Sequence, residues 1–191
     1  IIFSDIEPFW DEHVILTLSL SKLGLPGTRN GIVIAREDII EAMSRVNAMV
    51  SLANGNLGQA LVTPLLRNGE LLRIGSEIVR PFYENKSRQA IGWIDEAMGQ
   101  RVDYRLHASE GAIFLWLWLP GFPVDSQALY RRLKARKLLV VSEHYFFYGL
   151  PNPGWRHRQE CLRLTYSQPE AVVREGISIL ADECAAVVRG A

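Results

Sequence analysis

Residues 14–35 read VILTLSLSKLGLPGTRNGIVIA, and the fold is predicted outward from this stretch. Val14–Leu18 is a short apolar run typical of a buried strand, and Gly31–Ala35 is a second such run. A loop rich in glycine and proline lies between them, so the stretch predicts two strands joined by a tight connection. Lys22 follows the first strand, an unusual place because burying an ammonium group is costly unless it is paired or neutralised.

The loop between the two apolar runs carries side chains suited to an anion. Ser19 and Ser21 supply hydroxyls, Lys22 an ammonium and Arg29 a guanidinium, around glycines that let backbone N–H groups face outward. Hydroxyl and backbone donors suit phosphate oxygens, and a guanidinium can bind them bidentately. Each element alone has a simpler explanation, since turns of this composition are common and a lysine at a strand end usually reaches water. The combination at this spacing favours an anion site.

Beyond this stretch, the pattern predicts helices first and then strands alternating with helices. Apolar residues recur at helical spacing over residues 37–50 and again from Asn68 to Met98, with a kink expected at Pro81. Strands are expected at Val102–Leu106, Ala112–Leu119, Leu138–Val141 and Leu162–Thr165. A helix is expected over residues 125–137, and a last one after a capping box at residues 167–170. Trp116 and Trp118 are interpreted as core residues.

These elements predict an α/β protein in three parts. Residues 1–67 form a first part that includes Lys22, residues 68–98 a long connecting helix, and residues 99–191 a small α/β domain. Lys plus Arg and Asp plus Glu each number 21, so no bulk charge favours nucleic acid or an anionic membrane. The longest apolar run is too short for a membrane span, and two cysteines favour a reducing, cytoplasmic location. No metal site is expected.

Ser-x-Ser-Lys at residues 19–22, followed by Gly-x-Pro-Gly-x-Arg-x-Gly at residues 24–31, resembles the cofactor-lysine motif of fold-type I pyridoxal-phosphate enzymes. The resemblance implies that Lys22 carries pyridoxal 5'-phosphate through a Schiff base and acts as the catalytic residue. Ser19 and Arg29 would bind the cofactor phosphate, with Ser21 as a further candidate. The fold implied is the C-terminal part of such an enzyme, namely the end of its large cofactor-binding domain at residues 1–67 and its small α/β domain at residues 99–191.

Longer stretches resemble the valine–pyruvate aminotransferases within that superfamily, in the same order along the chain. They are IIFSD at residues 1–5, SLSKLGLPG at 19–27, EGAIFLWLW at 110–118 and LYRRLKAR at 129–136. This resemblance implies transfer of an amino group between valine, or another small aliphatic amino acid, and the 2-oxo acid pyruvate. It also implies a homodimer, in which residues 51–56 would approach the neighbouring subunit; a polar loop explains that segment equally well.

Arg163 lies between apolar neighbours in CLRLTY, residues 161–166. A guanidinium in such a strand needs a carboxylate partner, because burying it alone is expensive. From the residues alone, an internal salt bridge and a substrate carboxylate are equally good partners. The family holds the substrate α-carboxylate with an arginine on a late strand of the small domain, so the resemblance favours the substrate.

The loop at residues 142–147, SEHYFF, corresponds to a family loop that approaches the substrate, and its aromatics could wall an apolar pocket. The family tends to have Pro-Gly where Ser142-Glu143 stand, so the conformation of this loop is left open.

The family's remaining cofactor contacts lie upstream of residue 1, so we expect a truncated half that is poorly active alone. Another fold-type I enzyme, such as a lyase or decarboxylase, shares the lysine motif. The aminotransferase-like effector domain of a transcription regulator does so too, and neither alternative is excluded by the residues.

Overall fold

The computed structural model describes residues 2–3, 9–23, 25–52, 55–150 and 154–190. The chain divides into two compact units, residues 1–82 and 83–191. Some residues of the motifs used above lie outside the described residues. They are residues 1, 4–5 and 24, and residues 53–54 of the segment 51–56 that was predicted to approach the neighbouring subunit. The units meet inside the helix that the sequence assigns to the connector, and the three-part division stays a prediction.

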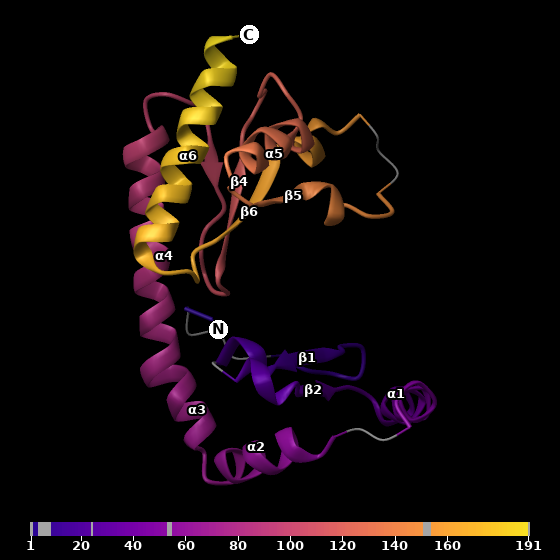
Figure 1. Ribbon diagram of the computed structural model, residues 1–191. Helices are drawn as coiled ribbons and strands as arrows, with labels where there is room; N and C mark the ends of the chain where they lie inside the picture. The colour runs from indigo at the N-terminus through magenta and orange to yellow at the C-terminus, as the bar shows by residue number, and fades with distance from the viewer. Residues whose placement is uncertain (1, 4–8, 24, 53–54, 151–153, 191) are drawn as a thin grey trace. The chain divides into compact units, whose positions relative to one another are not determined.

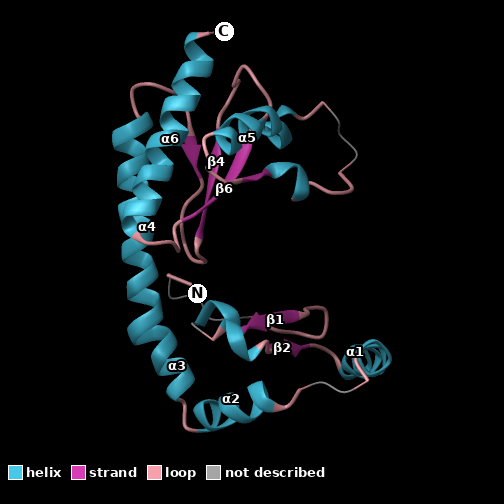
Figure 2. Cartoon of the chain, viewed as in Figure 1, coloured by secondary structure: helices cyan, strands magenta, loops and turns pink. Residues whose placement is uncertain are grey.

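Unit 1 is built around the predicted hairpin. Strands β1 (Leu16–Ser19) and β2 (Gly31–Ile34) form an antiparallel hairpin (Figure 2). In its register Ser19 stands opposite Gly31. Two short 3-10 turns, Leu20–Leu23 and Pro26–Thr28, form the connection. The expectation of a buried first strand is wrong for this chain, because Ile15 and Leu18 are 53% and 43% exposed. Within the described residues the hairpin is a two-stranded sheet, which is too small to bury its apolar side chains.

Two helices follow the hairpin in unit 1. Helix α1 (Glu37–Val50) has the predicted bounds, and α2 (Leu57–Arg67) was not predicted from the sequence. Pro64 and Gly58 weaken the helical signal of α2, which explains the omission. The buried residues Val62 of α2, Leu20 and Leu71 form a small core beneath the connection of the hairpin.

A continuous helical stretch leads from unit 1 into unit 2. It consists of α3 (Glu70–Ile74), a π-helical turn (Gly75–Val79) and α4 (Arg80–Met98). Proline has no N–H to donate within a helix, and the turn just before Pro81 is π-helical. In this turn the N–H of Arg80 donates to the carbonyl of Gly75, five residues earlier. The irregular turn therefore lies just before Pro81.

Unit 2 packs three helices against one face of a four-stranded antiparallel sheet in the order β3-β4-β6-β5 (Figure 1). The strands are β3 (Arg105–Leu106), β4 (Phe114–Trp118), β5 (Val141–Ser142) and β6 (Cys161–Thr165). The other two helices are α5 (Ser126–Ala135) and α6 (Glu170–Arg189). Strands occur in all four predicted regions, but the first three are shorter than expected, and β5 begins only at Val141, the last residue of its predicted range.

The core of unit 2 lies between the helices and one sheet face. Leu115 and Leu117 of β4 and Leu162 and Leu164 of β6 point into it, where they meet buried side chains of α4, α5 and α6. Because side chains alternate across a strand, Trp116 and the Arg163 side chain beside it face the opposite side. The interpretation of Trp116 and Trp118 as core residues is therefore wrong, and both are only partly buried.

Of the two N-terminal caps predicted for helices of unit 2, the cap of α5 is observed and that of α6 is not. Asp125 caps α5, since its carboxylate accepts a hydrogen bond from the backbone N–H of Ala128 at 2.6 Å. The predicted capping box before α6 is wrong, because Pro169 occupies the N-cap position without a side-chain cap. The Ser167 hydroxyl instead contacts the hydroxyl of Thr165 at 2.9 Å.

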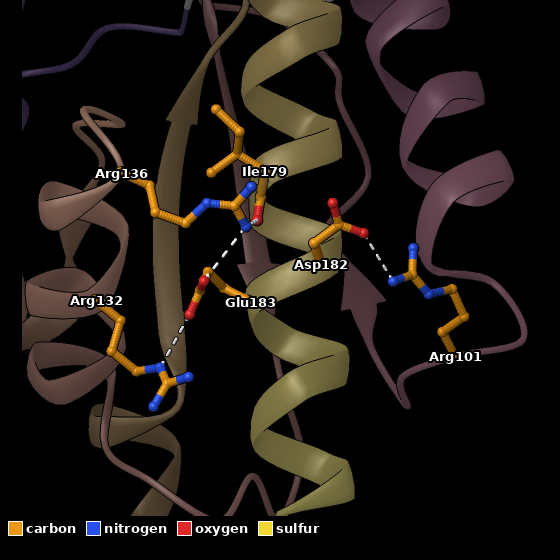
Figure 3. Close-up of polar contacts among 6 residues, drawn as sticks. All are labelled: Arg101, Arg132, Arg136, Ile179, Asp182 and Glu183. Carbon is orange, nitrogen blue, oxygen red and sulfur yellow. Dashed lines mark hydrogen bonds and ion pairs between the residues drawn. The ribbon is translucent and has the colours of Figure 1, made fainter.

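Ion pairs attach α6 to its neighbours, as Figure 3 shows. Glu183 receives hydrogen bonds from Arg132 at 3.0 Å and from Arg136 at 3.3 Å, both from the α5 side. Asp182 accepts one from Arg101 at 2.8 Å, which lies just beyond α4. Since the Glu183 side chain is only 15% exposed, its pair is the better shielded from water and the more stabilising of the two.

Candidate functional site

The lysine of the motif lies directly after β1, in the first turn of the hairpin connection. Lys22 is exposed, as is Ser19 at the end of the strand. The Ser19 hydroxyl oxygen accepts a hydrogen bond from the Ser21 N–H at 3.3 Å, which turns the chain away from the strand direction. The hydroxyl hydrogen of Ser19 remains to be donated to another acceptor. In the described chain, then, Lys22 reaches solvent, and the expected burial of its ammonium group is not observed.

Arg29 ends the second turn in a left-handed backbone conformation, with φ of 52°. Its N–H donates to the carbonyl of Pro26 at 3.3 Å, and the Thr28 hydroxyl donates to the carbonyl of Leu25 at 2.8 Å. A non-glycine residue is uncommon in this conformation, and such strain persists only where the surroundings enforce it. Among the described residues no carboxylate pairs with the exposed Arg29 guanidinium, which leaves its donors for an external anion.

Helix α2 closes one side of a hollow over this turn. The hollow measures about 810 Å³ and is lined by residues 25–31, Asn47, Gly55 and the first turns of α2. Gly58 is buried there, and a Cβ atom at this position would lie 2.1 Å from the carbonyl oxygen of Thr28. The close approach of the two backbones thus requires glycine. Arg29 lines this hollow, whereas Ser19, Ser21 and Lys22 do not belong to its lining.

These donors fit a phosphate ester. Hydroxyls, an ammonium and a guanidinium are the groups that bind phosphate oxygens, and here Ser19, Ser21, Lys22 and Arg29 all belong to one short connection. The connection is fixed at both ends by β1 and β2, and at its centre by backbone hydrogen bonds from Leu20 to Asn30 and from Leu25 to Leu20. The four side chains therefore lie along one short segment of unit 1, and of them Arg29 alone lines the hollow.

Arg163 belongs to unit 2, on the sheet face opposite the core. In β6 it stands directly opposite Trp116 of β4 and Val141 of β5. Its guanidinium carbon lies 4.3 Å from the centroid of the Phe114 ring and 5.1 Å from that of Phe146. No hydrogen bond or ion pair of this side chain occurs within the part of the chain that the structure describes. The internal salt bridge considered from the sequence is therefore not found among these residues.

An aromatic cluster extends along the same face. The His157 ring lies 4.8 Å from that of Trp118, 5.1 Å from that of Trp155 and 5.8 Å from that of Phe147. Burial lowers the pKa of His157, and the neighbouring His107 lowers it further, while Glu160 acts in the opposite direction. This cluster was not predicted from the sequence, because its members come from three separate segments.

Cys161 is buried beneath His157, with 3.5 Å between its sulfur and the His157 Nε2. Burial raises the pKa of the Cys161 thiol to about 12. A thiol in this state is a poor nucleophile, since the thiolate is the reactive form. Cys161 is thus a structural residue of the site face.

The loop at residues 142–147 is held by its second residue. Glu143 is 1% exposed, and one of its carboxylate oxygens has no partner among the described residues. Burial raises the pKa of this carboxyl. The Phe146 N–H donates to the Glu143 carbonyl at 2.7 Å, while the Ser142 hydroxyl contacts the His144 Nδ1 at 2.8 Å. The conformation of this loop was not predicted from the sequence, and the structure shows that it contains a 3-10 turn, Glu143–Tyr145, which begins at the buried acid.

Comparison with known proteins supplies the family. The model of the aminotransferase class I and II family matches residues 5–180. The chain belongs to this family. A valine–pyruvate aminotransferase from Escherichia coli K12 is 42% identical over 96% of the chain. A 2-aminoadipate transaminase from Thermus thermophilus is 28% identical over 86% of the chain and covers 38% of that relative.

A solved structure agrees with this relationship. Valine–pyruvate aminotransferase from Salmonella typhimurium LT2 superposes on the whole chain with a TM-score of 0.92 and 41% identity. The chain has the fold-type I aminotransferase fold, which confirms the resemblance drawn from the motifs. It spans 43% of the length of the Escherichia coli relative and 48% of the Salmonella chain.

Two features are absent from the described residues. These residues contain no helix that is both long and apolar enough to cross a membrane. They also contain no group of three or more histidine, cysteine or acidic side chains arranged to hold a metal ion.

Proposed function

We propose that this protein is a pyridoxal-phosphate-dependent aminotransferase that exchanges an amino group between valine, or another small aliphatic amino acid, and pyruvate. The observation that carries the proposal is the hairpin connection with Lys22 and its phosphate donors, in a chain that is 42% identical to a valine–pyruvate aminotransferase. Family membership supports the type of chemistry, and the similarity of this relative supports the choice of substrates.

The residues of the connection divide the work on the cofactor. Lys22 holds it through its ε-amine, and Ser19, Ser21 and Arg29 bind its phosphate. Bound pyridoxal phosphate supplies the electron sink for breaking a bond at the substrate Cα. The ε-amine of Lys22 would accept the proton from the substrate Cα and deliver it to the C4′ carbon of the cofactor, a role suited to an amine on a flexible stem. The strained turn at Arg29 and the packed Gly58 keep the phosphate donors in place.

Arg163 binds the α-carboxylate of the substrate in this proposal. Its side chain faces away from the core of unit 2 and carries no ion pair to the described residues, so its N–H donors can form a bidentate pair with a carboxylate.

We further propose that the native protein is a cytoplasmic homodimer. The two cysteines of this chain are free and buried, which suits a reducing compartment. Met49 and Val50 of α1 are 86% and 79% exposed, and so much exposed apolar surface supports packing against a further protein surface.

The test is an assay of the native protein with valine and pyruvate. We expect alanine and 2-oxoisovalerate to form in equal amounts, and Lys22→Ala to abolish their formation. Lys134→Ala, which removes an exposed lysine of α5, is the matched control and should retain the activity. Release of carbon dioxide without alanine would refute amino transfer and favour a decarboxylase. Loss of activity in the control variant would show that the loss in Lys22→Ala is not specific to Lys22.

A further inference from the structure

Among the residues that the structure describes, the guanidinium of Arg163 contacts two aromatic rings and no acid. Phe114 and Phe146 place their ring centroids 4.3 Å and 5.1 Å from its central carbon. Both distances fall within the range in which a cation is attracted to the face of an aromatic ring. A carboxylate in the same place would occupy the N–H donors, whereas a ring contacts the face of the group and leaves the N–H edge for a ligand.

The two rings differ in how they are held. Phe114 belongs to β4 and is fixed by the sheet, while Phe146 belongs to the loop after β5. The Phe146 ring meets Trp116 edge-on, with centroids 5.1 Å apart and planes at 89°. Its backbone N–H is bonded to Glu143, the buried residue that begins the turn. Phe146 therefore has support on two sides, although its side chain is 43% exposed.

We propose that Phe146, together with Phe114, positions the Arg163 guanidinium for the substrate carboxylate. This inference rests on the function proposed above and adds to it a residue that acts through Arg163 rather than on the substrate. An unheld arginine side chain has many rotamers, and ordering it on binding weakens affinity. The rings order it beforehand and present its donors without the competition of an internal acid.

The choice of variants separates the ring from its bulk. Phe146→Leu keeps an apolar side chain but removes the aromatic face, and Phe146→Tyr keeps the face. Tyr148→Leu is the control for loss of an aromatic ring nearby, since Tyr148 is 96% exposed. All three changes lie in one loop, so general effects on that loop should be shared.

The experiment measures binding and geometry together on the native protein. The chemical shift of the Arg163 Nε–H, assigned with Arg163→Lys, reports the ring current of its aromatic neighbours, and pyruvate is titrated as the carboxylate probe. We expect Phe146→Leu to move this resonance downfield and to weaken pyruvate binding about three- to ten-fold, the range that a cation–π contact supports. KM for valine should rise by the same factor with kcat nearly unchanged. Phe146→Tyr should restore both, and Tyr148→Leu should change neither.

The outcomes distinguish this inference from the function on which it rests. Equal pyruvate affinity in Phe146→Leu and the unaltered protein would overturn the positioning role alone. A fall in kcat rather than a rise in KM would also overturn it, by pointing to a role in the reaction itself. If the unaltered protein fails to bind pyruvate at Arg163, the proposed function fails and the positioning role fails with it.

Discussion

Replacing Gly58 by alanine tests the contact that shapes the Arg29 turn. The added Cβ would lie 2.1 Å from the carbonyl oxygen of Thr28. A carbon and an oxygen atom approach to roughly 3.3 Å in comfortable contact, so the two backbones must separate by about 1 Å. One atom is a backbone oxygen and the other is a Cβ, and the backbone fixes the positions of both, so no rotamer change can relieve the clash.

The size of the effect follows from two opposing terms. Overpacking in a well-packed site costs about 1–3 kcal/mol, while alanine in place of glycine in a helix contributes up to about 1 kcal/mol. We therefore expect Gly58→Ala to be destabilised by about 1–2 kcal/mol, or by several degrees in Tm, since 1 kcal/mol corresponds to about 2–4 °C in a chain of this size. The turn carrying Arg29 should move with α2, so affinity for pyridoxal phosphate should fall as well.

The assay is thermal and urea unfolding of the native protein, followed by titration with pyridoxal phosphate. Gly92→Ala is the control, because Gly92 lies within α4 and a Cβ there meets nothing within 4 Å. This variant should gain about 0.5–1 kcal/mol. If Gly58→Ala proves as stable as Gly92→Ala and binds the cofactor normally, the steric argument for the turn is refuted.

Three further predictions concern unit 2. Glu183→Gln should lower the free energy of unfolding, measured in urea, by about 1–2 kcal/mol, because two arginines lose a shielded charged partner. Glu41→Gln, at an exposed ion pair, should lower it by less than about 0.5 kcal/mol. Equal losses in the two variants would contradict the difference in shielding. Burial raises the pKa of Glu143 above its usual 4.5, so the carboxyl ionises at lower pH in the unfolded state than in the folded state. The free energy of unfolding should therefore fall as pH rises from about 4 toward the raised pKa, and Glu143→Gln should lack this fall. The same pH profile in the variant and the unaltered protein would contradict the role of Glu143. Burial raises the pKa of both Cys161 and Cys184 to about 12, so mass spectrometry should find neither labelled by iodoacetamide at pH 8 until the protein is unfolded; rapid labelling of either in the folded state would contradict their burial.

The fold was predictable where one signal dominated. The two apolar runs around Lys22 predicted the hairpin, and regular helical spacing predicted α1 and α6. Prediction failed at α2, where glycine and proline interrupt the pattern although tertiary contacts retain the helix. It also failed for Trp116, since a run that is apolar at every position does not reveal which side chains face the core.

The candidate site was predictable as a set of residues and not as an arrangement. The motif identified Ser19, Ser21, Lys22 and Arg29 from their order along the chain, but it could not indicate that Gly58 packs against their loop. For Arg163 the residues left a choice between an internal acid and a ligand. The rings that contact it, Phe114 and Phe146, are distant in sequence, so only the sheet register and the loop bring them together.

The central claim is that Lys22 carries the cofactor. The most direct measurement is borohydride reduction of the native protein with pyridoxal phosphate, followed by mass spectrometry of its peptides. The phosphopyridoxyl group should be found on Lys22 and be absent from Lys22→Ala. A label on another lysine, or none on Lys22 at saturating cofactor, would contradict the account.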